Sequence, residues 1–147
     1  MPKLDLAAFP PVCRTGYPPP YNEAVAGRWQ RRFAKPVGLK KLGANHVTLE
    51  PGAWSSQRHW HVGEDELLVM LSGEAVLVED DGETILAPGD ICYWPAGAEN
   101  GHCLQNRSAA QCSFIAVSAG RDTGGFYSDI DMMWGAKGFT RKDGTKI

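Results

Sequence analysis

The sequence predicts an all-β fold of the sandwich or jelly-roll barrel type. The 147 residues include 17 glycines and 10 prolines, a density typical of many tight turns. Short strand-like runs follow one another at intervals of roughly ten residues, at residues 44–50, 54–61, 66–71, 74–79, 83–87, 91–94, 101–106 and 112–118. Gly- or Pro-containing turn signals separate most of these runs. Regular short strands of this kind favour a barrel over βαβ units.

The flanks of these runs look different. Residues 1–36 are predicted to form an extended N-terminal arm, because a group of prolines there cannot donate to a strand ladder. Residues 22–33 within it are expected to form a short helix. We assign residues 37–120 to the barrel core and residues 121–147 to a C-terminal extension, with a strand or short helix near residues 127–134 and loose residues after it. The length suits one domain.

Composition excludes several classes of protein. The hydrophobic and charged fractions are 43% and 22%, and the net charge is -2, so nothing indicates binding to nucleic acid or to a membrane surface. No apolar stretch is long enough for a membrane-spanning helix, and the N-terminus lacks the continuous apolar core of a secretory signal. Four cysteines form no CxxC pair, which favours free thiols and a cytoplasmic location.

One basic cluster has two interpretations. It comprises Arg28, Arg31, Arg32 and Lys35. Charge runs of this kind are usually a solvated face or a set of ion pairs. The alternative is contact with an anionic ligand or with a second subunit.

The segment His59-Trp60-His61 carries most of the chemical information. In a strand, residues two apart point to the same face, so both imidazoles can grip one ion. Glu66 follows a turn-like segment and can face the same ion from the next strand. His102 can close the site from the facing sheet. Nitrogen and carboxylate ligands together suit Mn, Fe, Co, Ni, Cu or Zn, and do not suit Ca or Mg.

With these residues the sequence resembles the cupin superfamily. The first cupin motif, G-x5-H-x-H-x3,4-E-x6-G, corresponds to Gly52, His59, His61, Glu66 and Gly73, and the second, G-x5-P-x-G-x2-H-x3-N, to Gly89, Pro95, Gly97, His102 and Asn106. Six residues rather than five separate Gly52 from His59, so a bulge is expected there. Four rather than two separate Gly97 from His102, so that loop is expected to be longer.

The resemblance implies a double-stranded β-helix, the jelly-roll barrel of cupins. It also implies that His59, His61, Glu66 and His102 bind one divalent transition metal inside the barrel. One or two coordination positions would stay open for water, substrate or dioxygen. Asp65 is a rival to Glu66, but the gap of six residues before Gly73 favours Glu66. A metal-free cupin that uses these residues as polar pocket lining is the alternative.

Alternation along the strands predicts further pocket residues. Gln57 shares the face of the two histidines, Leu68 and Met70 share that of Glu66, and Leu104 shares that of His102. Either Tyr93 or its neighbour Trp94, not both, points inward, and Tyr93 is kept as a candidate. These residues predict a mostly apolar pocket for a small organic ligand. Nothing places His46 in the site.

Three functions remain open at this stage. The first is a metal-dependent enzyme for a small oxygenated metabolite, similar to the cupins that are dioxygenases, decarboxylases or sugar and sugar-phosphate isomerases. The second is a non-enzymatic binding or sensor protein, and the third is a structural oligomer without a ligand. A homodimer is expected, in which the arm of residues 1–36 lies on the partner and covers a sheet edge.

Overall fold

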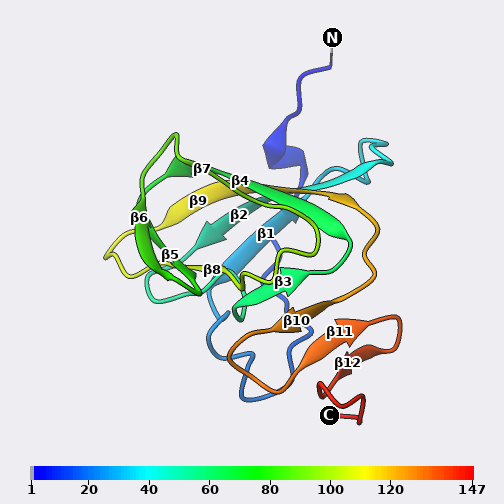
Figure 1. Cartoon of the computed structure of the whole chain (residues 1–147). Coiled ribbons are helices and arrows are strands. Elements are labelled where there is room, and N and C mark those ends of the chain that lie inside the picture. Colours follow the sequence, from blue (N-terminus) through cyan, green and yellow to red (C-terminus); the bar gives the residue numbers. More distant parts are fainter. Residues whose placement is uncertain (1) are drawn as a thin grey trace.

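Antiparallel sheets dominate the chain, which a computed structural model describes over residues 2–147 (Figure 1). The largest sheet has the order β1-β2-β9-β4-β7, formed by β1 (Arg28–Arg32), β2 (Leu42–Leu49), β9 (Cys112–Gly120), β4 (Glu64–Ser72) and β7 (Ile91–Trp94). A second sheet, β6-β5-β8, is formed by β6 (Gly82–Leu86), β5 (Ala75–Glu79) and β8 (Cys103–Gln105). A third, β12-β11-β10-β3, is formed by β12 (Gly138–Thr140), β11 (Met133–Gly135), β10 (Gly125–Tyr127) and β3 (His59–His61). A 3-10 helix, η1, lies at Leu6–Ala8.

The apolar core lies between the first two sheets. Leu68 and Met70 of β4 meet Leu77 of β5, Leu104 of β8 and Phe114 of β9 there, all of them buried. Because side chains alternate along a strand, Glu66 projects from the same face of β4 as Leu68 and Met70. The core therefore continues directly into the polar site, and the same strand supports both.

The all-β prediction is confirmed, and residues 91–94 form β7 as predicted. Most other predicted strands differ by one or two residues at their ends. The run at residues 54–61 is the exception, because bends occupy residues 55–58 and only His59–His61 forms a strand.

The helix predicted at residues 22–33 is wrong. Turns and bends occupy residues 19–27, and β1 follows at Arg28–Arg32, paired in antiparallel register with β2. Arg28, Gln30 and Arg32 line a cavity, while Trp29 and Arg31 lie on the other face. Both faces of β1 therefore carry polar side chains, so the apolar alternation that marks a strand is missing, and pairing with β2 decides the conformation.

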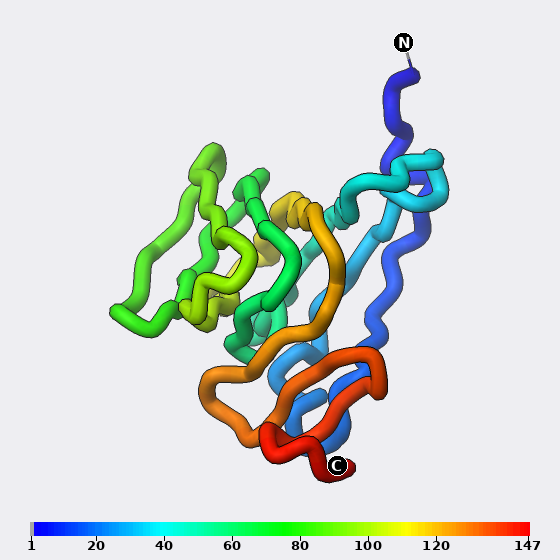
Figure 2. The backbone as a smooth tube through the Cα atoms, turned by 45° about the vertical axis from the view of Figure 1, so that its right-hand side comes forward, coloured from blue at the N-terminus to red at the C-terminus, as the bar shows by residue number. Residues whose placement is uncertain are grey.

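The two ends of the chain meet each other. Val12 forms an isolated bridge with Gln30, so the N-terminal segment covers the free edge of β1 in its own chain. Figure 2 shows this segment, in blue, running down one side of the molecule towards the orange and red C-terminal strands. Tyr17 and Phe139 are in ring contact there, with centroids 5.6 Å apart.

Two further expectations concern the cysteines and the membrane. All the cysteines are free thiols, as predicted, namely Cys13, Cys92, Cys103 and Cys112. Within residues 2–147, no helix has both the length and the hydrophobicity needed to span a bilayer.

Candidate metal centre

Strand β3 places two imidazoles side by side. His59 and His61 are two residues apart on this strand, and their Nε2 atoms lie 3.1 Å from each other. The other ring nitrogen of His59, Nδ1, lies 2.9 Å from the carbonyl oxygen of Gln57. A carbonyl oxygen can only accept a hydrogen bond, so Nδ1 of His59 carries the proton in the neutral ring. The Nε2 atom of His59 then presents a lone pair to the site.

Glu66 of β4 and His102 approach the same point, Glu66 from the largest sheet and His102 from a position beside β3, just before β8. Glu66 Oε2 lies 3.2 Å from His61 Nε2 and 3.0 Å from His102 Nε2. Nδ1 of His102 faces the carbonyl oxygen of Asn100 at 3.2 Å, so this ring too holds its proton on Nδ1 when neutral. His102 is 4% exposed and forms an isolated bridge with His59.

These atoms fit a bound cation. One donor atom each from His59, His61 and Glu66 forms a set in which all atoms lie within 4.8 Å of one another. His102 is outside that tight set but touches Glu66 Oε2. Lone pairs that face a carboxylate oxygen repel it unless a proton or a cation lies between them. Imidazole and carboxylate donors together suit a divalent transition metal.

The pKa values of three of these groups are displaced. Burial lowers the pKa of His59 to about 4, helped by the neighbouring His102 charge. Burial also opposes the charge of His61, but the hydrogen bond to Glu66 and the charges of Glu66 and Glu64 outweigh it and raise the His61 pKa. Burial acts to raise the pKa of Glu66, yet its bonds to His102 and His61 prevail and hold that pKa well below its usual range. Glu66 is thus an anion at neutral pH.

Aromatic rings enclose the imidazoles. Trp94 of β7 stacks on His102 with centroids 3.8 Å apart and an angle of 8° between the planes. Its indole Nε1 donates to Glu79 Oε1 at 2.7 Å, which fixes the ring. From the C-terminal extension, Trp134 presents its ring to His59 and His61 at centroid distances of 5.4 and 5.2 Å. The site is therefore shielded on two sides by apolar surface.

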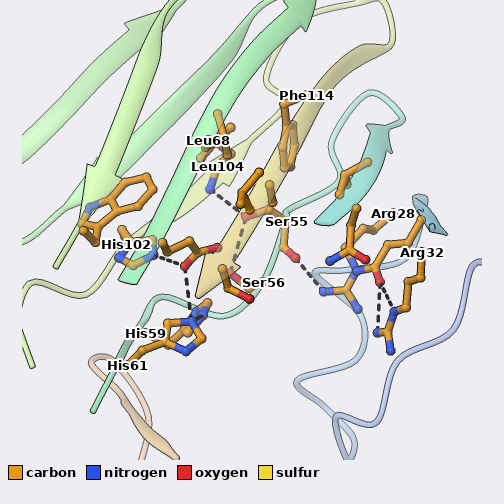
Figure 3. A pocket seen from close by; sticks show the side chains of 18 of the residues that line it. Arg28, Arg32, Ser55, Ser56, His59, His61, Leu68, His102, Leu104 and Phe114 are labelled. Carbon is orange, nitrogen blue, oxygen red and sulfur yellow. Dashed lines mark hydrogen bonds and ion pairs between the residues drawn. The ribbon is translucent and has the colours of Figure 1, made fainter. Parts of the chain in front are cut away.

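A cavity of about 300 Å³ adjoins this cluster (Figure 3). Its lining includes the four predicted metal ligands together with Leu68 and Leu104, two of the predicted pocket residues. The remaining lining is more polar than expected. It includes Arg28, Arg32, Gln30, Asn45, Tyr17, Ser55, Ser56 and Ser118.

Three predicted pocket residues lie elsewhere. Tyr93 is 72% exposed on the outside of β7, and Trp94 takes the inward position instead, as the alternation of a strand requires. Met70 is buried deeper in the core, beyond Leu68. Gln57 lies in the bent segment, where alternation does not apply, and its amide donates to the carbonyl oxygen of Tyr21 at 2.9 Å.

Sequence reasoning missed the residues that the two chain ends contribute. Trp134 and Tyr17 lie far from the histidine motifs in the sequence, and nothing local marks them as part of a site. The spacing of Arg28, Gln30 and Arg32 was a usable signal, because three polar residues at alternate positions share one face of a strand. His46 does not line this cavity, in line with its predicted place outside the site.

A family model described as a cupin domain matches residues 45–118, about half of the chain. The chain belongs to the cupin family. The two histidine motifs had indicated this family, and the match spans both of them.

Several known proteins resemble this cupin. A crystal structure described as a sugar phosphate isomerase of the cupin superfamily from Silicibacter pomeroyi is 43% identical, with 99% of this chain and 96% of that chain covered and a TM-score of 0.92. The oxalate-binding protein of Thermotoga maritima is 31% identical over 71 residues, which are 48% of this chain and 56% of that protein. The cupin thus spans about half the length of that curated relative. The polyketide cyclase RemF from Streptomyces resistomycificus shares the fold at 20% identity, with 88% of each chain covered and a TM-score of 0.66.

Proposed function

We propose that this cupin is a metal-dependent isomerase of a small sugar phosphate. The observation that carries the proposal is the likeness along the whole chain to the sugar phosphate isomerase from Silicibacter pomeroyi, at 43% identity. The size and polarity of the cavity support it, since about 300 Å³ suits a small ligand rich in hydroxyl groups. Dioxygenase and decarboxylase chemistry, which the sequence left open, find less support in that likeness.

His59, His61, Glu66 and His102 are the residues that would hold the metal, one divalent ion of Fe, Mn, Ni, Zn, Co or Cu. When bound, such an ion supplies a Lewis acid that polarises a carbonyl or hydroxyl oxygen of the sugar. The chain itself supplies the surroundings. The backbone carbonyl oxygens at Gln57 and Asn100 fix the orientation of two imidazoles, as partners of metal-ligating histidines commonly do.

The test is a conversion assay on a panel of triose to heptose phosphates. Protein loaded with each candidate metal is incubated with each aldose phosphate, and the ketose phosphate is followed by NMR. We expect conversion of at least one substrate, and its loss together with the bound metal in the His59→Ala/His61→Ala double variant. Arg107→Gln serves as the control, because Arg107 pairs with Glu83 on the surface away from the cavity. Metal-loaded protein that converts none of the panel would contradict the proposal.

A second candidate is a binding protein for a small dicarboxylate. The observation that favours it is the 31% identity to the oxalate-binding protein over 71 residues. If the protein is such a binding protein, we expect oxalate to raise the melting temperature of the metal-loaded protein and to be recovered unchanged. Turnover of a sugar phosphate, with no thermal effect of oxalate, would rule the second candidate out.

We also propose a homodimer, but through a different surface from the N-terminal arm that the sequence suggested. The arm already covers β1 of its own chain through the Val12–Gln30 bridge, so it does not need a partner for this. The outer face of the largest sheet carries exposed apolar side chains instead, with Tyr93 at 72%, Ile91 at 62% and Leu71 at 45% exposure. We expect a dimeric mass in analytical ultracentrifugation, and a monomeric mass for the Ile91→Lys/Tyr93→Lys variant. A monomeric wild type would contradict the dimer.

A further inference from the structure

Two arginines reach into the cavity opposite the histidines. Arg28, Gln30 and Arg32 occupy alternate positions on β1 and line the same cavity as His59, His61 and Glu66. In Figure 3 the arginines and the imidazoles approach from opposite sides, with Ser55 and Ser56 between them. The cavity therefore has two different ends, with three imidazoles and the Glu66 carboxylate at one end and two guanidinium groups at the other.

Within residues 2–147, Arg28 has no carboxylate partner. Its Nη1 donates to the carbonyl oxygen of Ser55 at 2.6 Å and its Nη2 to that of Arg14 at 3.4 Å. Its Nε is buried and makes no hydrogen bond. Burial lowers the pKa of Arg28, which reports the cost of removing this charge from water. A desolvated guanidinium without an opposite charge is unfavourable in itself, so a ligand that supplies the charge is the simplest reason to keep it.

Arg32 likewise pairs with no acidic residue in the described part of the chain. Its Nε and Nη2 both donate to Gln30 Oε1 at 3.1 Å, and the residue is exposed, so the guanidinium is open to an anionic ligand. Among the residues that line the cavity in the described chain, Glu66 is the one acid, and it belongs to the histidine end.

Three other arginines in residues 2–147 are ion-paired. Arg58, Arg107 and Arg141 each pair with an aspartate or a glutamate. Arg31 of the same strand as Arg28 also donates to carbonyl oxygens, those of Leu6 and Phe9, but it lies on the opposite face of β1 from the cavity.

Burial sets Arg28 apart from Arg14 and Arg121, which also form no ion pair within residues 2–147 but are exposed. Arg28 fits neither a solvated face nor a set of ion pairs. Arg32 is exposed, and its place on the cavity wall brings it into the argument.

We propose that Arg28 and Arg32 bind the phosphate group of the substrate, so that the sugar end extends towards His59 and His61. The inference rests on the proposed function and adds to it the residues that recognise the anionic group. Guanidinium groups offer several N–H donors in a fixed plane, which matches the oxygens of a phosphate. Asn45 and Ser118 line the same cavity and supply further polar contacts. A carboxylate shares the oxyanion chemistry, and the experiment separates the two.

The experiment measures anion binding by isothermal titration calorimetry, without turnover. Inorganic phosphate and oxalate are titrated separately into wild type and into the His59→Ala/His61→Ala variant, where neither anion can bind through a metal on the histidines. We expect phosphate to bind both proteins and oxalate to bind the double variant more weakly than phosphate. Charge-assisted hydrogen bonds of this kind predict that Arg28→Gln and Arg32→Gln weaken phosphate binding by roughly 10- to 100-fold.

Two further variants separate recognition from folding. Arg107→Gln removes the same charge at the surface and is expected to bind phosphate as wild type does. Arg28→Lys keeps the charge but loses the planar fork, so its phosphate affinity is expected to lie between those of wild type and Arg28→Gln. If Arg28→Gln fails to fold, as judged by circular dichroism, Arg28→Lys and the exposed Arg32→Gln decide the question.

The phosphate titrations and the turnover assay together distinguish failure of the anion site from failure of the proposed function. Phosphate affinity unchanged in folded Arg28 and Arg32 variants overturns the proposal, and so does oxalate binding at the arginines in the absence of phosphate binding. Arginine-dependent phosphate binding in a protein that isomerises no sugar phosphate removes the proposed function and leaves the anion site standing. If sugar phosphates are isomerised equally well by wild type and by the Arg28 and Arg32 variants, the proposed function stands and the anion site at the arginines is overturned.

Discussion

At the scale of single residues, two backbone carbonyl oxygens decide what the site can bind. They face Nδ1 of His59 and of His102, and so direct both Nε2 lone pairs inward. Glu66 adds an ionised oxygen at 3.2 and 3.0 Å from His61 and His102. The result is a cluster of acceptors, which a proton can hold together at acid pH and a metal ion at higher pH.

This competition predicts how metal affinity varies with pH. His59, with a pKa near 4, is already neutral above about pH 5. His61 has a raised pKa, so it keeps a proton above pH 6.5, the ordinary value, and the metal must displace it. Raising the pH removes that proton and therefore strengthens binding. We expect Zn²⁺ affinity, measured by chelator competition, to rise from pH 6 upward and to level off above the pKa of His61.

The control for this prediction is Glu64→Gln. The Glu64 carboxylate lies 3.4 Å from His61 Nδ1 and is one cause of the raised pKa of His61. Removing its charge lowers that pKa, so the rise in affinity should begin at a lower pH than in wild type. Zinc affinity that is flat between pH 6 and 8 in wild type would show that His61 does not carry the proton.

The residues of the site differ in how far the sequence could predict them. The period of two along a strand is enough to bring His59 and His61 together, and a turn before β4 is enough to bring Glu66 near them. The same rule misplaced Gln57, because residues 55–58 bend out of the strand. Trp134 could not be predicted at all, since its ring reaches the histidines only through the pairing of β10 with β3.

At the scale of elements, the C-terminal strands complete the site. β10 pairs with β3 and β11 pairs with β10, so the extension is added to the strand that carries two of the histidines. Gly125 sits at the crossing, opposite His61 on one side and Trp134 on the other. A Cβ at Gly125 would lie 2.0 Å from the Trp134 ring and 2.2 Å from the carbonyl oxygen of Trp60. Only glycine lets these strands approach so closely.

Gly125→Ala therefore tests the role of this hairpin. The added methyl must displace the Trp134 ring or part β10 from β3, and such overpacking typically costs about 1–3 kcal/mol. We expect a lower free energy of unfolding in urea and a metal affinity reduced by roughly 10-fold or more, as for other groups that support metal ligands.

Gly135→Ala is the matched control in the same hairpin. Its Cβ would meet nothing nearer than the carbonyl oxygen of Thr123 at 4.0 Å. The substitution should leave metal affinity unchanged and can add up to about 1 kcal/mol of stability by restricting the unfolded chain. Equal effects of the two substitutions would show that the close approach at Gly125 does not matter.

The strands that the sequence predicted poorly share one property, which is that none of them contributes a side chain to the apolar core. β1 has polar side chains on both faces, since one face lines the cavity. β10 and β11 lie at the two ends of residues 127–134, predicted only as a strand or short helix, and β12 lies among the residues predicted to be loose. None of these three strands contributes to the apolar core. The strands β2 and β4 to β9 each place apolar side chains in the core, and these were the predictable ones. Local pattern thus locates strands that face the core, whereas strands that build the site depend on tertiary pairing.

At the scale of the whole molecule, aromatic contacts join the two ends of the chain beside the metal centre. Tyr17 of the N-terminal segment packs against Tyr127, with centroids 5.5 Å apart, and against Phe139 at 5.6 Å. Tyr127 in turn lies 5.8 Å from His59. The ends, the barrel and the site are therefore linked through one cluster of rings, so we expect them to unfold together.

A double-mutant cycle on Tyr17→Ala and Phe139→Ala measures this link. Aromatic pairs contribute about 0.5–1.5 kcal/mol beyond the area they bury, so the coupling between the two substitutions should fall in this range. Phe9 packs on Phe33 instead, which makes Phe9→Ala with Phe139→Ala the control pair, additive within about 0.5 kcal/mol. Urea unfolding followed by tryptophan fluorescence and by circular dichroism gives both quantities. Tyr17 and Phe139 meet only in the folded chain, so zero coupling between the two substitutions would mean that the ends unfold separately from the barrel. Unfolding transitions that differ between fluorescence and circular dichroism would have the same meaning.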